Sequence, residues 1–400
     1  MIILLVSSLY YPKIIGGAEI STQLLAENLV KESGNEIHIL TTDIKDSDEI
    51  LNGVIVHRRR MSNISSFWKF KKSLNSLKRV AYKILDFYTV SNKRIIGKLL
   101  DEIKPDIVHV NNIYGFSAVI WDEIDKRKIP IVNTYRDYYV MCPRASLMSN
   151  GVYCLRPKAL CVIYRRMLMR FMHKVCKHVA ISRYVQGQLK KNLNIDSEVI
   201  YNSIDVNKVT FEENYSRKKE RVRKITKFVF VGALIPTKGI LDFARVFVDC
   251  NPENMELHIL GEGPLSKDIR ALNSGSIILH GFVSGEEKKS IMEDMDVAVC
   301  PSLWNEPFGR VVIEAFQYAL PVITSNMGGL SELVDSVTGI VCDVNSPNTF
   351  KEAIEFYSTK WNGLDFLQYE RMEELLTKFD IGVQVERYMS IYRDLIEGEQ

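Results

Sequence analysis

Residues 297–318 read VAVCPSLWNEPFGRVVIEAFQY, and this stretch decides the fold. Its first four residues form a short apolar run typical of a buried strand, and the next nine form a loop broken by Pro and Gly. Val312, Ala315 and Phe316 then recur at helical spacing, which predicts a helix from Arg310 to about Tyr318.

The same order of elements repeats further along the chain. Residues 321–324 are typical of a second strand, Gly328-Gly329 opens another short helix, and residues 338–341 are typical of a third strand. Strand, loop and helix in alternation indicate a parallel sheet, whose ligands bind at the carboxyl ends of the strands.

Two carboxylates lie in the central stretch, Glu306 in the loop and Glu314 in the helix. The first N–H groups of a helix lack helical partners, so those of Phe308, Gly309 and Arg310 could hold a phosphate. The carboxylates would then accept hydrogen bonds from sugar or ribose hydroxyls. The alternative is that Glu314 is a solvated helix residue and Glu306 a partner of the helix dipole.

Glu306-Pro307-Phe308-Gly309 with Glu314, followed by Gly328-Gly329, resembles the donor-site signature of glycosyltransferase family 4. The resemblance covers nearly the whole chain. It implies an α/β protein of the GT-B fold, with two Rossmann-like domains whose parallel sheets face across a cleft. It also implies retaining transfer of a sugar from a nucleotide-diphosphate sugar, with Glu306 and Lys238 in catalysis and Glu314 on the donor ribose.

The resemblance divides the chain into three parts. Residues 1–207 would form the N-terminal acceptor-side domain and residues 208–380 the C-terminal domain that binds the nucleotide sugar. Residues 381–400 would form a helix that packs back on the first domain. A charged stretch at 212–227 is interpreted as the linker.

Composition favours a globular protein of the cytoplasm. Hydrophobic residues make up 46% and charged residues 25%, and no apolar run is long enough to cross a bilayer. Seven cysteines without a Cys-x-x-Cys pair argue against a disulfide framework. Residues 1–207 hold 31 Lys and Arg against 19 Asp and Glu, a net charge of +12, whereas residues 208–400 carry −9. The first half should therefore meet an anionic partner.

Two basic segments in the first half suit an anionic membrane surface. Residues 58–98 contain twelve cations and one acid, interleaved with aromatic residues, and Trp68, Lys71 and Lys72 are candidate contacts. Residues 138–195 contain no Asp or Glu at all. We expect peripheral association with the inner face of the plasma membrane. The alternatives are an ordinary solvated helix face and nucleic acid, for which no binding motif is present.

Further donor contacts come from two glycine loops and from Lys238. Gly16 and Gly17 follow the first strand, and the resemblance places such a loop near the donor diphosphate. Gly261 and Gly263 resemble the base-recognition loop, and Lys238 stands where the family holds the leaving diphosphate. The family often adds an Arg where this chain has Ala233, so another cation such as Arg183 or Arg310 would have to help.

Residues 134–144 resemble the acceptor-side loop of the family. Arg136 stands where a His is usual, and Asp137 could orient or deprotonate an acceptor hydroxyl. The alternative for Asp137 is a strand-end residue that caps a turn. Arg136 and Arg144 are candidate contacts on the acceptor and membrane side.

These observations predict a glycosyltransferase that extends a lipid-linked glycan, such as a polyprenyl-diphosphate-linked one, for a surface polysaccharide such as lipopolysaccharide. No cofactor and no metal are expected, and Asp294 and Asp296 are interpreted as surface charge. Ala233 and Arg136 support a rival function, a weakly active or inactive scaffold that binds a nucleotide sugar or lipid. A Rossmann oxidoreductase and a GT-B epimerase of sugar nucleotides are further alternatives.

Overall fold

The computed structural model describes residues 1–14, 16–61, 87–149, 152–154, 156–220, 224–251, 253–361 and 363–398. The chain forms two compact units. Unit 1 comprises Met1–Ser149, Cys154–Ser203 and Ile381–Gln400, and unit 2 comprises Asn150–Tyr153 and Ile204–Asp380. No described helix has the length and apolar character needed to cross a membrane.

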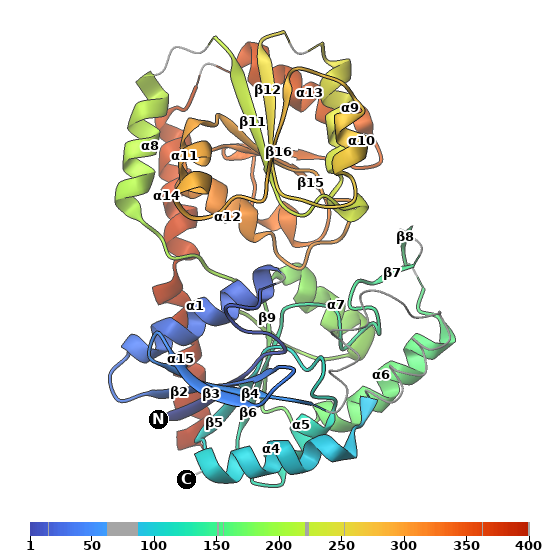
Figure 1. Cartoon of the computed structure of the whole chain (residues 1–400), viewed down its shortest axis with the longest axis vertical. Helices are drawn as coiled ribbons and strands as arrows, with labels where there is room; N and C mark the ends of the chain where they lie inside the picture. Colours follow the sequence, from blue (N-terminus) through green and yellow to red (C-terminus); the bar gives the residue numbers. More distant parts are fainter. Residues whose placement is uncertain are drawn as a thin grey trace. The chain divides into compact units, whose positions relative to one another are not determined.

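Unit 1 is built on an eight-stranded sheet (Figure 1). Its strands, in spatial order, are β10 (Glu198–Val199), β9 (Lys177–Ala180), β6 (Ile131–Tyr135), β5 (Ile107–Val110), β1 (Ile2–Val6), β2 (Glu36–Thr42), β4 (Val54–Arg59) and β3 (Ser47–Leu51). Every neighbouring pair is parallel except β3 and β4. The chain winds outward in opposite directions from β1 and β5, so these neighbours form the topological switch point of unit 1.

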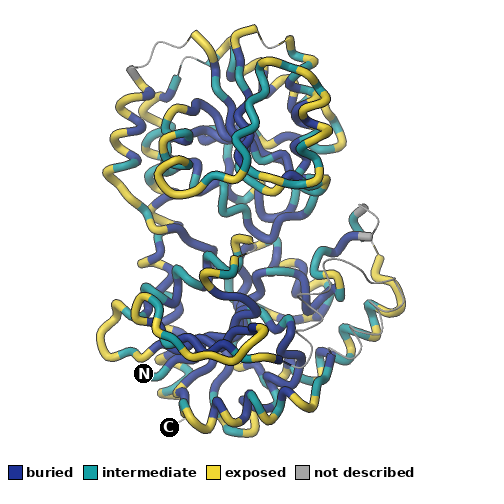
Figure 2. Tube along the Cα trace, viewed as in Figure 1, coloured by how far each residue is buried: buried dark blue, intermediate teal, exposed yellow. Residues whose placement is uncertain are grey.

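The described helices of unit 1 are α1 (Gly17–Lys31), α4 (Val90–Ile103), α5 (Val119–Asp125), α6 (Ala159–Met172), α7 (Arg183–Leu193) and α15 (Ile381–Glu397). Two short strands, β7 (Met148–Ser149) and β8 (Val152–Tyr153), form a separate two-stranded sheet. Figure 2 shows that the central strands are buried while the outer sides of the helices are exposed.

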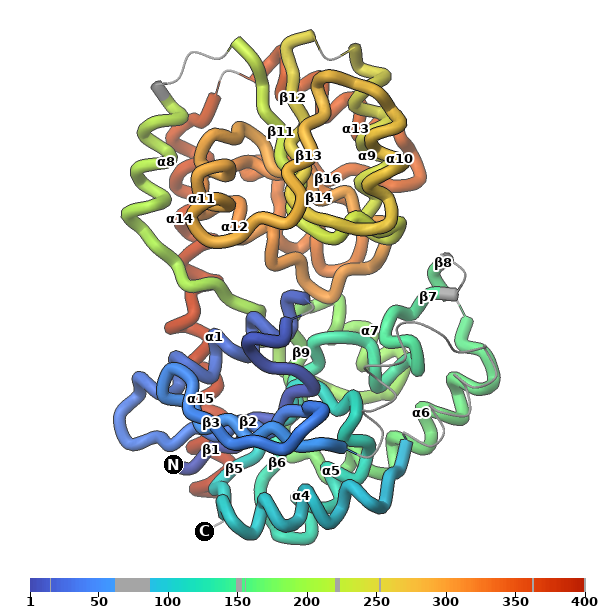
Figure 3. Tube along the Cα trace, in the orientation of Figure 1, coloured from blue at the N-terminus to red at the C-terminus, as the bar shows by residue number. Residues whose placement is uncertain are grey.

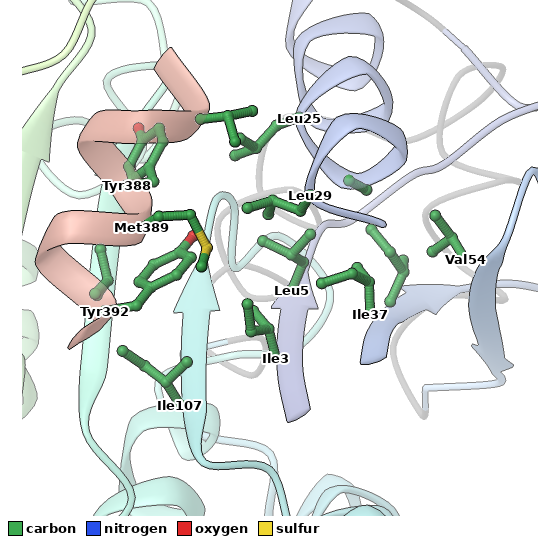
Figure 4. Close-up of a cluster of buried hydrophobic side chains, with 14 of the residues drawn as sticks. Ile3, Leu5, Leu25, Leu29, Ile37, Val54, Ile107, Tyr388, Met389 and Tyr392 are labelled. Atoms are coloured by element: carbon green, nitrogen blue, oxygen red, sulfur yellow. The ribbon is translucent and has the colours of Figure 1, made fainter. Parts of the chain in front are cut away.

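The last helix, α15, belongs to the core of unit 1 although it follows unit 2 in the sequence. Figure 3 traces it beside α1, and Figure 4 shows Tyr388, Met389 and Tyr392 among the apolar side chains of α1 and the strands. Two tyrosine hydroxyls also meet polar groups of the sheet. Tyr392 Oη lies 2.6 Å from His109 Nδ1, and Tyr388 Oη lies 2.9 Å from Thr134 Oγ1. These contacts satisfy polar groups that would be costly to bury alone.

Unit 2 is built on a six-stranded parallel sheet. Its strands, in spatial order, are β13 (Ile277–Gly281), β12 (Met255–Leu260), β11 (Thr226–Val231), β14 (Val297–Cys300), β15 (Val322–Ser325) and β16 (Gly339–Cys342). The winding reverses between β11 and β14, which form the switch point of this unit. The prediction of two α/β units on parallel sheets is confirmed.

The helices of unit 2 are mostly amphipathic and cover this sheet. They are α8 (Lys208–Glu220), α9 (Ile240–Asp249), α10 (Ser266–Arg270), α11 (Gly285–Asp294), α12 (Arg310–Gln317), α13 (Pro347–Glu355) and α14 (Phe366–Lys378), with the short turns η1 (Pro236–Lys238), η2 (Gly329–Glu332) and η3 (Phe356–Lys360). The core includes Phe228, Phe243, Phe247 and Val299.

Two sequence interpretations in unit 2 are wrong. The charged stretch taken as a linker begins within helix α8, which buries Phe211 and Lys218; Lys218 Nζ donates to the carbonyl of Glu293 at 2.9 Å. Asp296, taken as surface charge, is fully buried and accepts the backbone N–H of Lys227 at 2.9 Å. Charge in a sequence does not show exposure, because a strand end or helix end can bind the charged group.

Each unit contains its own pair of stacked histidines. His38 Nδ1 lies 2.9 Å from His57 Nε2 in unit 1, and His258 Nδ1 lies 3.0 Å from His280 Nε2 in unit 2. In each unit the first histidine follows Glu-x on the second strand, in 36-EIHIL-40 and 256-ELHIL-260. Burial lowers the pKa of His57 and His280, in each case assisted by the neighbouring ring.

These histidines predict loss of stability on acidification. The unfolded state takes up protons near pH 6.5, whereas the folded pKa of His57 and His280 is lower, so the free energy of unfolding should fall below about pH 6.5. Replacing both histidines with Gln should reduce the change in the free energy of unfolding with pH, whereas replacing the exposed His173 with Gln should leave it as it is. Urea unfolding between pH 7.5 and pH 5 measures this pH dependence. An unchanged dependence in the double variant would contradict its assignment to His57 and His280.

Candidate active site

The candidate site of unit 2 lies at its switch point. Lys238 ends the turn η1 after β11, and Glu306 lies in the loop after β14, the neighbouring strand. Lys238 Nζ lies 2.6 Å from Glu306 Oε1, and the two side chains are 32% and 10% exposed. Burial alone would lower the pKa of Lys238, but the Glu306 carboxylate more than offsets this and raises it. The structure thus brings together two residues that are 68 positions apart in sequence.

The loop around Glu306 is held in place from both sides. Ser302 Oγ lies 3.1 Å from Glu306 Oε1, and the Glu306 carbonyl accepts the N–H of Gly329 at 2.7 Å. Gly328 has φ of +69°, and a Cβ there would lie 2.3 Å from the Glu306 carbonyl oxygen. Only glycine fits this approach, which explains the Gly-Gly pair after β15.

Pro307 and Phe308 lie in the loop between Glu306 and helix α12. Both are buried, and Phe308 packs edge-on against Phe379 at 5.8 Å between ring centroids. The chain then enters α12 through Gly309. Helix α12 therefore begins shortly after Glu306 in the sequence, and the positive end of its dipole lies at Gly309.

Glu314 lies on α12 and has two cationic partners. Arg310 Nε lies 2.8 Å from Glu314 Oε1, and Lys288 Nζ of α11 lies 2.9 Å from Oε2. Burial would raise the pKa of Glu314, but Lys288 and Arg310 hold it below its usual value. Lys288 was not predicted, since it lies 26 residues from Glu314 and no motif marks it. Arg310, considered above as a replacement for the missing Arg at Ala233, is in this structure paired with Glu314.

The glycines of the second predicted donor loop, Gly261 and Gly263, border a cavity of about 260 Å³. Gly261, Gly263 and Gly281 line it together with Arg270. Gly261 has φ of +150°, and a Cβ there would lie 1.9 Å from the carbonyl oxygen of Gly232. A Cβ at Gly263 would lie 2.4 Å from the carbonyl oxygen of Leu234. The two glycines therefore allow one loop to pack against the backbone of the next.

The glycines predicted at the first loop, Gly16 and Gly17, are exposed at the start of α1 in unit 1. The N–H of Gly16 donates to Glu19 Oε2 at 2.8 Å, so a carboxylate of the same chain already occupies this donor. This contact weakens the predicted role of Gly16 toward a diphosphate.

Asp137 lies beyond the end of β6 with both carboxylate oxygens hydrogen-bonded. Tyr139 N donates to Oδ1 at 2.7 Å, and Asn112 Nδ2 donates to Oδ2 at 3.0 Å. The pKa of Asp137 is raised to about 6, chiefly by burial and further by the charge of Glu19, against the lowering effect of the two donors. A carboxyl with such a pKa can exchange protons near neutral pH.

The acceptor-side arginines differ in position. Arg136 is 5% exposed, and its guanidinium donates to Asn111 Oδ1 at 2.9 Å and to Asn202 Oδ1 at 2.5 Å. The prediction of a membrane contact for Arg136 is therefore wrong, because the side chain is bound inside unit 1. Arg144 is exposed. Trp68, Lys71 and Lys72 lie outside the described residues.

Within the described part of the chain, no group of three or more His, Cys, Asp or Glu side chains is arranged to hold a metal ion. The two sites do offer charged groups and hydrogen-bonding groups. Unit 2 offers a cation beside a carboxylate, and unit 1 offers a carboxylate that titrates near neutrality.

Comparison with known proteins finds two family matches. Residues 211–374 match "Glycosyl transferases group 1", and residues 15–208 match "Glycosyltransferase Family 4". An "Uncharacterized 42.6 kDa protein in cps region" of Klebsiella pneumoniae is 30% identical over 346 residues, which cover 83% of this chain and 87% of that protein.

Solved structures share the fold at low sequence identity. A sucrose-phosphate synthase of Thermosynechococcus elongatus aligns with a TM-score of 0.71 at 16% identity and covers 99% of both chains. An Anabaena protein solved in complex with UDP and glucose aligns with a TM-score of 0.65 at 16% identity and covers 97% of this chain and 98% of that one. The predicted GT-B fold is confirmed.

The glycine loop of unit 2 yields a stability prediction. Gly261→Ala should lower the free energy of unfolding by roughly 2 kcal/mol or more, because its Cβ would overlap the Gly232 carbonyl in a backbone conformation that alanine avoids. Gly275→Ala is the matched control, since nothing lies within 4 Å of its added Cβ. Urea unfolding compares them, and equal stabilities would contradict the close approach.

Proposed function

The chain belongs to the group 1, family 4 glycosyltransferases, and from this we propose that it is a retaining enzyme using a nucleotide-diphosphate sugar to extend a lipid-linked glycan. The observation that carries the proposal is the Lys238–Glu306 pair at the β11–β14 switch point. Membership of a transferase family favours catalysis over the non-catalytic alternative, and sugar transfer over hydride transfer or epimerisation.

Lys238 and Glu306 could bind the groups on either side of the bond that breaks in the donor. The Lys238 ammonium can neutralise charge on the leaving diphosphate, and Glu306 can accept a hydrogen bond from a hydroxyl of the donor sugar. The bond between the anomeric carbon and the phosphate oxygen breaks, and a bond to the acceptor oxygen forms on the same face. The acceptor proton passes to the leaving phosphate oxygen, so charge is balanced without an added reagent.

The nucleoside fits the remaining groups of unit 2. Glu314 can accept from ribose hydroxyls while Lys288 and Arg310 keep it ionised. The cavity bordered by Gly261, Gly263 and Gly281 would take the base, and the next residue, Phe282, is 76% exposed and able to stack on it. The Anabaena protein with the same fold was solved with UDP, which supports a nucleotide at this fold.

The acceptor side is proposed from charge and from a relative. The Klebsiella protein is named for a cps region, which supports a role in surface polysaccharide biosynthesis. Helix α6 exposes Leu160 and Ile163 along one side with Arg166 and Arg170, and the segment 138–195 contains no acid. Such a face suits an anionic membrane, where a lipid-linked acceptor would be presented at the cytoplasmic side.

The donor proposal predicts selective thermal stabilisation. One nucleoside diphosphate series should raise the melting temperature, because a ligand at a hundredfold excess over its Kd stabilises by about 2.7 kcal/mol. Glu314→Ala should weaken this shift, whereas Glu352→Ala, an exposed glutamate on α13, should not. Differential scanning fluorimetry measures both. The proposal would be contradicted if no nucleotide raised the melting temperature, or if Glu314→Ala left the increase unchanged.

The membrane proposal predicts salt-sensitive binding to vesicles. Arg166→Glu with Arg170→Glu should weaken binding to phosphatidylglycerol-containing vesicles more than tenfold, since each cation contributes roughly 1 kcal/mol. Lys289→Glu with Lys351→Glu makes the same change of charge in unit 2 and should leave binding nearly unchanged. Cosedimentation measures it, and equal loss in both double variants would show that only net charge matters.

A further inference from the structure

We propose that Asn112, backed by Ser8, positions the Asp137 carboxylate in a hydroxyl-binding site of unit 1. The inference rests on the proposed function, since it assigns the acceptor hydroxyl to this place. It adds two residues, Asn112 and Ser8, that no sequence motif above singled out.

The three polar residues stand at equivalent points of neighbouring strands. Ser8, Asn112 and Asp137 each lie two residues beyond the end of a strand, namely β1, β5 and β6, which are adjacent in the sheet. The β1–β5 neighbours are also the switch point of unit 1, where the connecting helices leave in opposite directions and open a crevice. The side chains thus meet where the fold itself favours a ligand.

The hydrogen bonds determine which way the Asn112 amide faces. The backbone N–H of Tyr114 can only donate, and it lies 2.8 Å from Asn112 Oδ1, so this atom must be the amide oxygen. Ser8 Oγ lies 2.9 Å from the same oxygen and 2.6 Å from the carbonyl oxygen of Tyr114, so its one proton is shared between these two acceptors. The amide nitrogen is therefore directed at Asp137 Oδ2, 3.0 Å away. Asn112 cannot flip without losing these contacts.

This arrangement leaves the Asp137 carboxylate oriented but able to accept more. Each oxygen of Asp137 has one fixed donor, Tyr139 N or Asn112 Nδ2, while a carboxylate has about four acceptor sites. Asp137 is also partly exposed. A hydroxyl of an acceptor sugar could donate to a remaining site, and the carboxylate would orient it for attack.

The test uses two variants that act on Asp137 in opposite directions. Asn112→Ala removes a donor to the carboxylate and should raise the pKa of Asp137 by roughly half a unit to one unit, whereas Glu19→Gln removes a negative charge and should lower it. Ser8→Ala should act like Asn112→Ala but more weakly, and it carries the test if Asn112→Ala does not fold. Carbon-13 NMR of labelled aspartate, assigned with Asp137→Asn, follows the titration without any substrate.

A purely structural role would destabilise the variants without moving the titration. An unchanged Asp137 titration, or shifts of the same sign for Asn112→Ala and Glu19→Gln, would overturn the proposal. The acid limb of the pH–rate profile of sugar transfer should shift with the NMR titration in each variant. If the Asp137 titrations shift as expected but the pH–rate profile of sugar transfer does not, Asn112 still positions the carboxylate, and the acceptor role of the site is contradicted.

Discussion

A buried charge needs an opposite charge beside it, and this constraint holds the loop after β14 against the turn after β11. Lys238 and Glu306 are both removed from much of the solvent and lie 2.6 Å apart, so each makes the other's ionised form tolerable. The same loop is also held by other contacts, namely Gly328, the Ser302 hydroxyl and the start of α12. A ligand that binds here meets groups that are already charged and already placed, which reduces the cost of ordering them.

The two units use the same topology for opposite charges. Each places polar side chains beyond strands at or next to its switch point, but unit 2 offers the Lys238 ammonium and unit 1 offers the Asp137 carboxylate. Under the proposed function, the first arrangement would bind the donor diphosphate and the second a hydroxyl of the acceptor. The proposal therefore assigns the two substrates of a sugar transfer to different units.

The fold was largely predictable because both sheets are parallel, apart from the β3–β4 pair, and most of their strands are apolar runs. The strand 297–300 was predicted with the bounds that the structure has. The pairing of Lys238 with Glu306 was not predictable from spacing, and the family resemblance only suggested a shared role. The burial of Arg136 was missed because its partners, Asn111 and Asn202, are distant in sequence. The repeat Glu-x-His-Ile-Leu at 36–40 and 256–260 was a visible signal of the paired histidines.

The central claim is that the donor diphosphate binds at Lys238. Isothermal titration of the most stabilising nucleoside diphosphate into the wild type, Lys238→Gln and Lys267→Gln tests it directly. Lys267 lies on α10 of the same unit and controls for the loss of one positive charge. We expect Lys238→Gln to weaken binding at least tenfold, on the order of one charge-assisted hydrogen bond, and Lys267→Gln to bind like the wild type. Equal affinity in all three proteins would contradict the account.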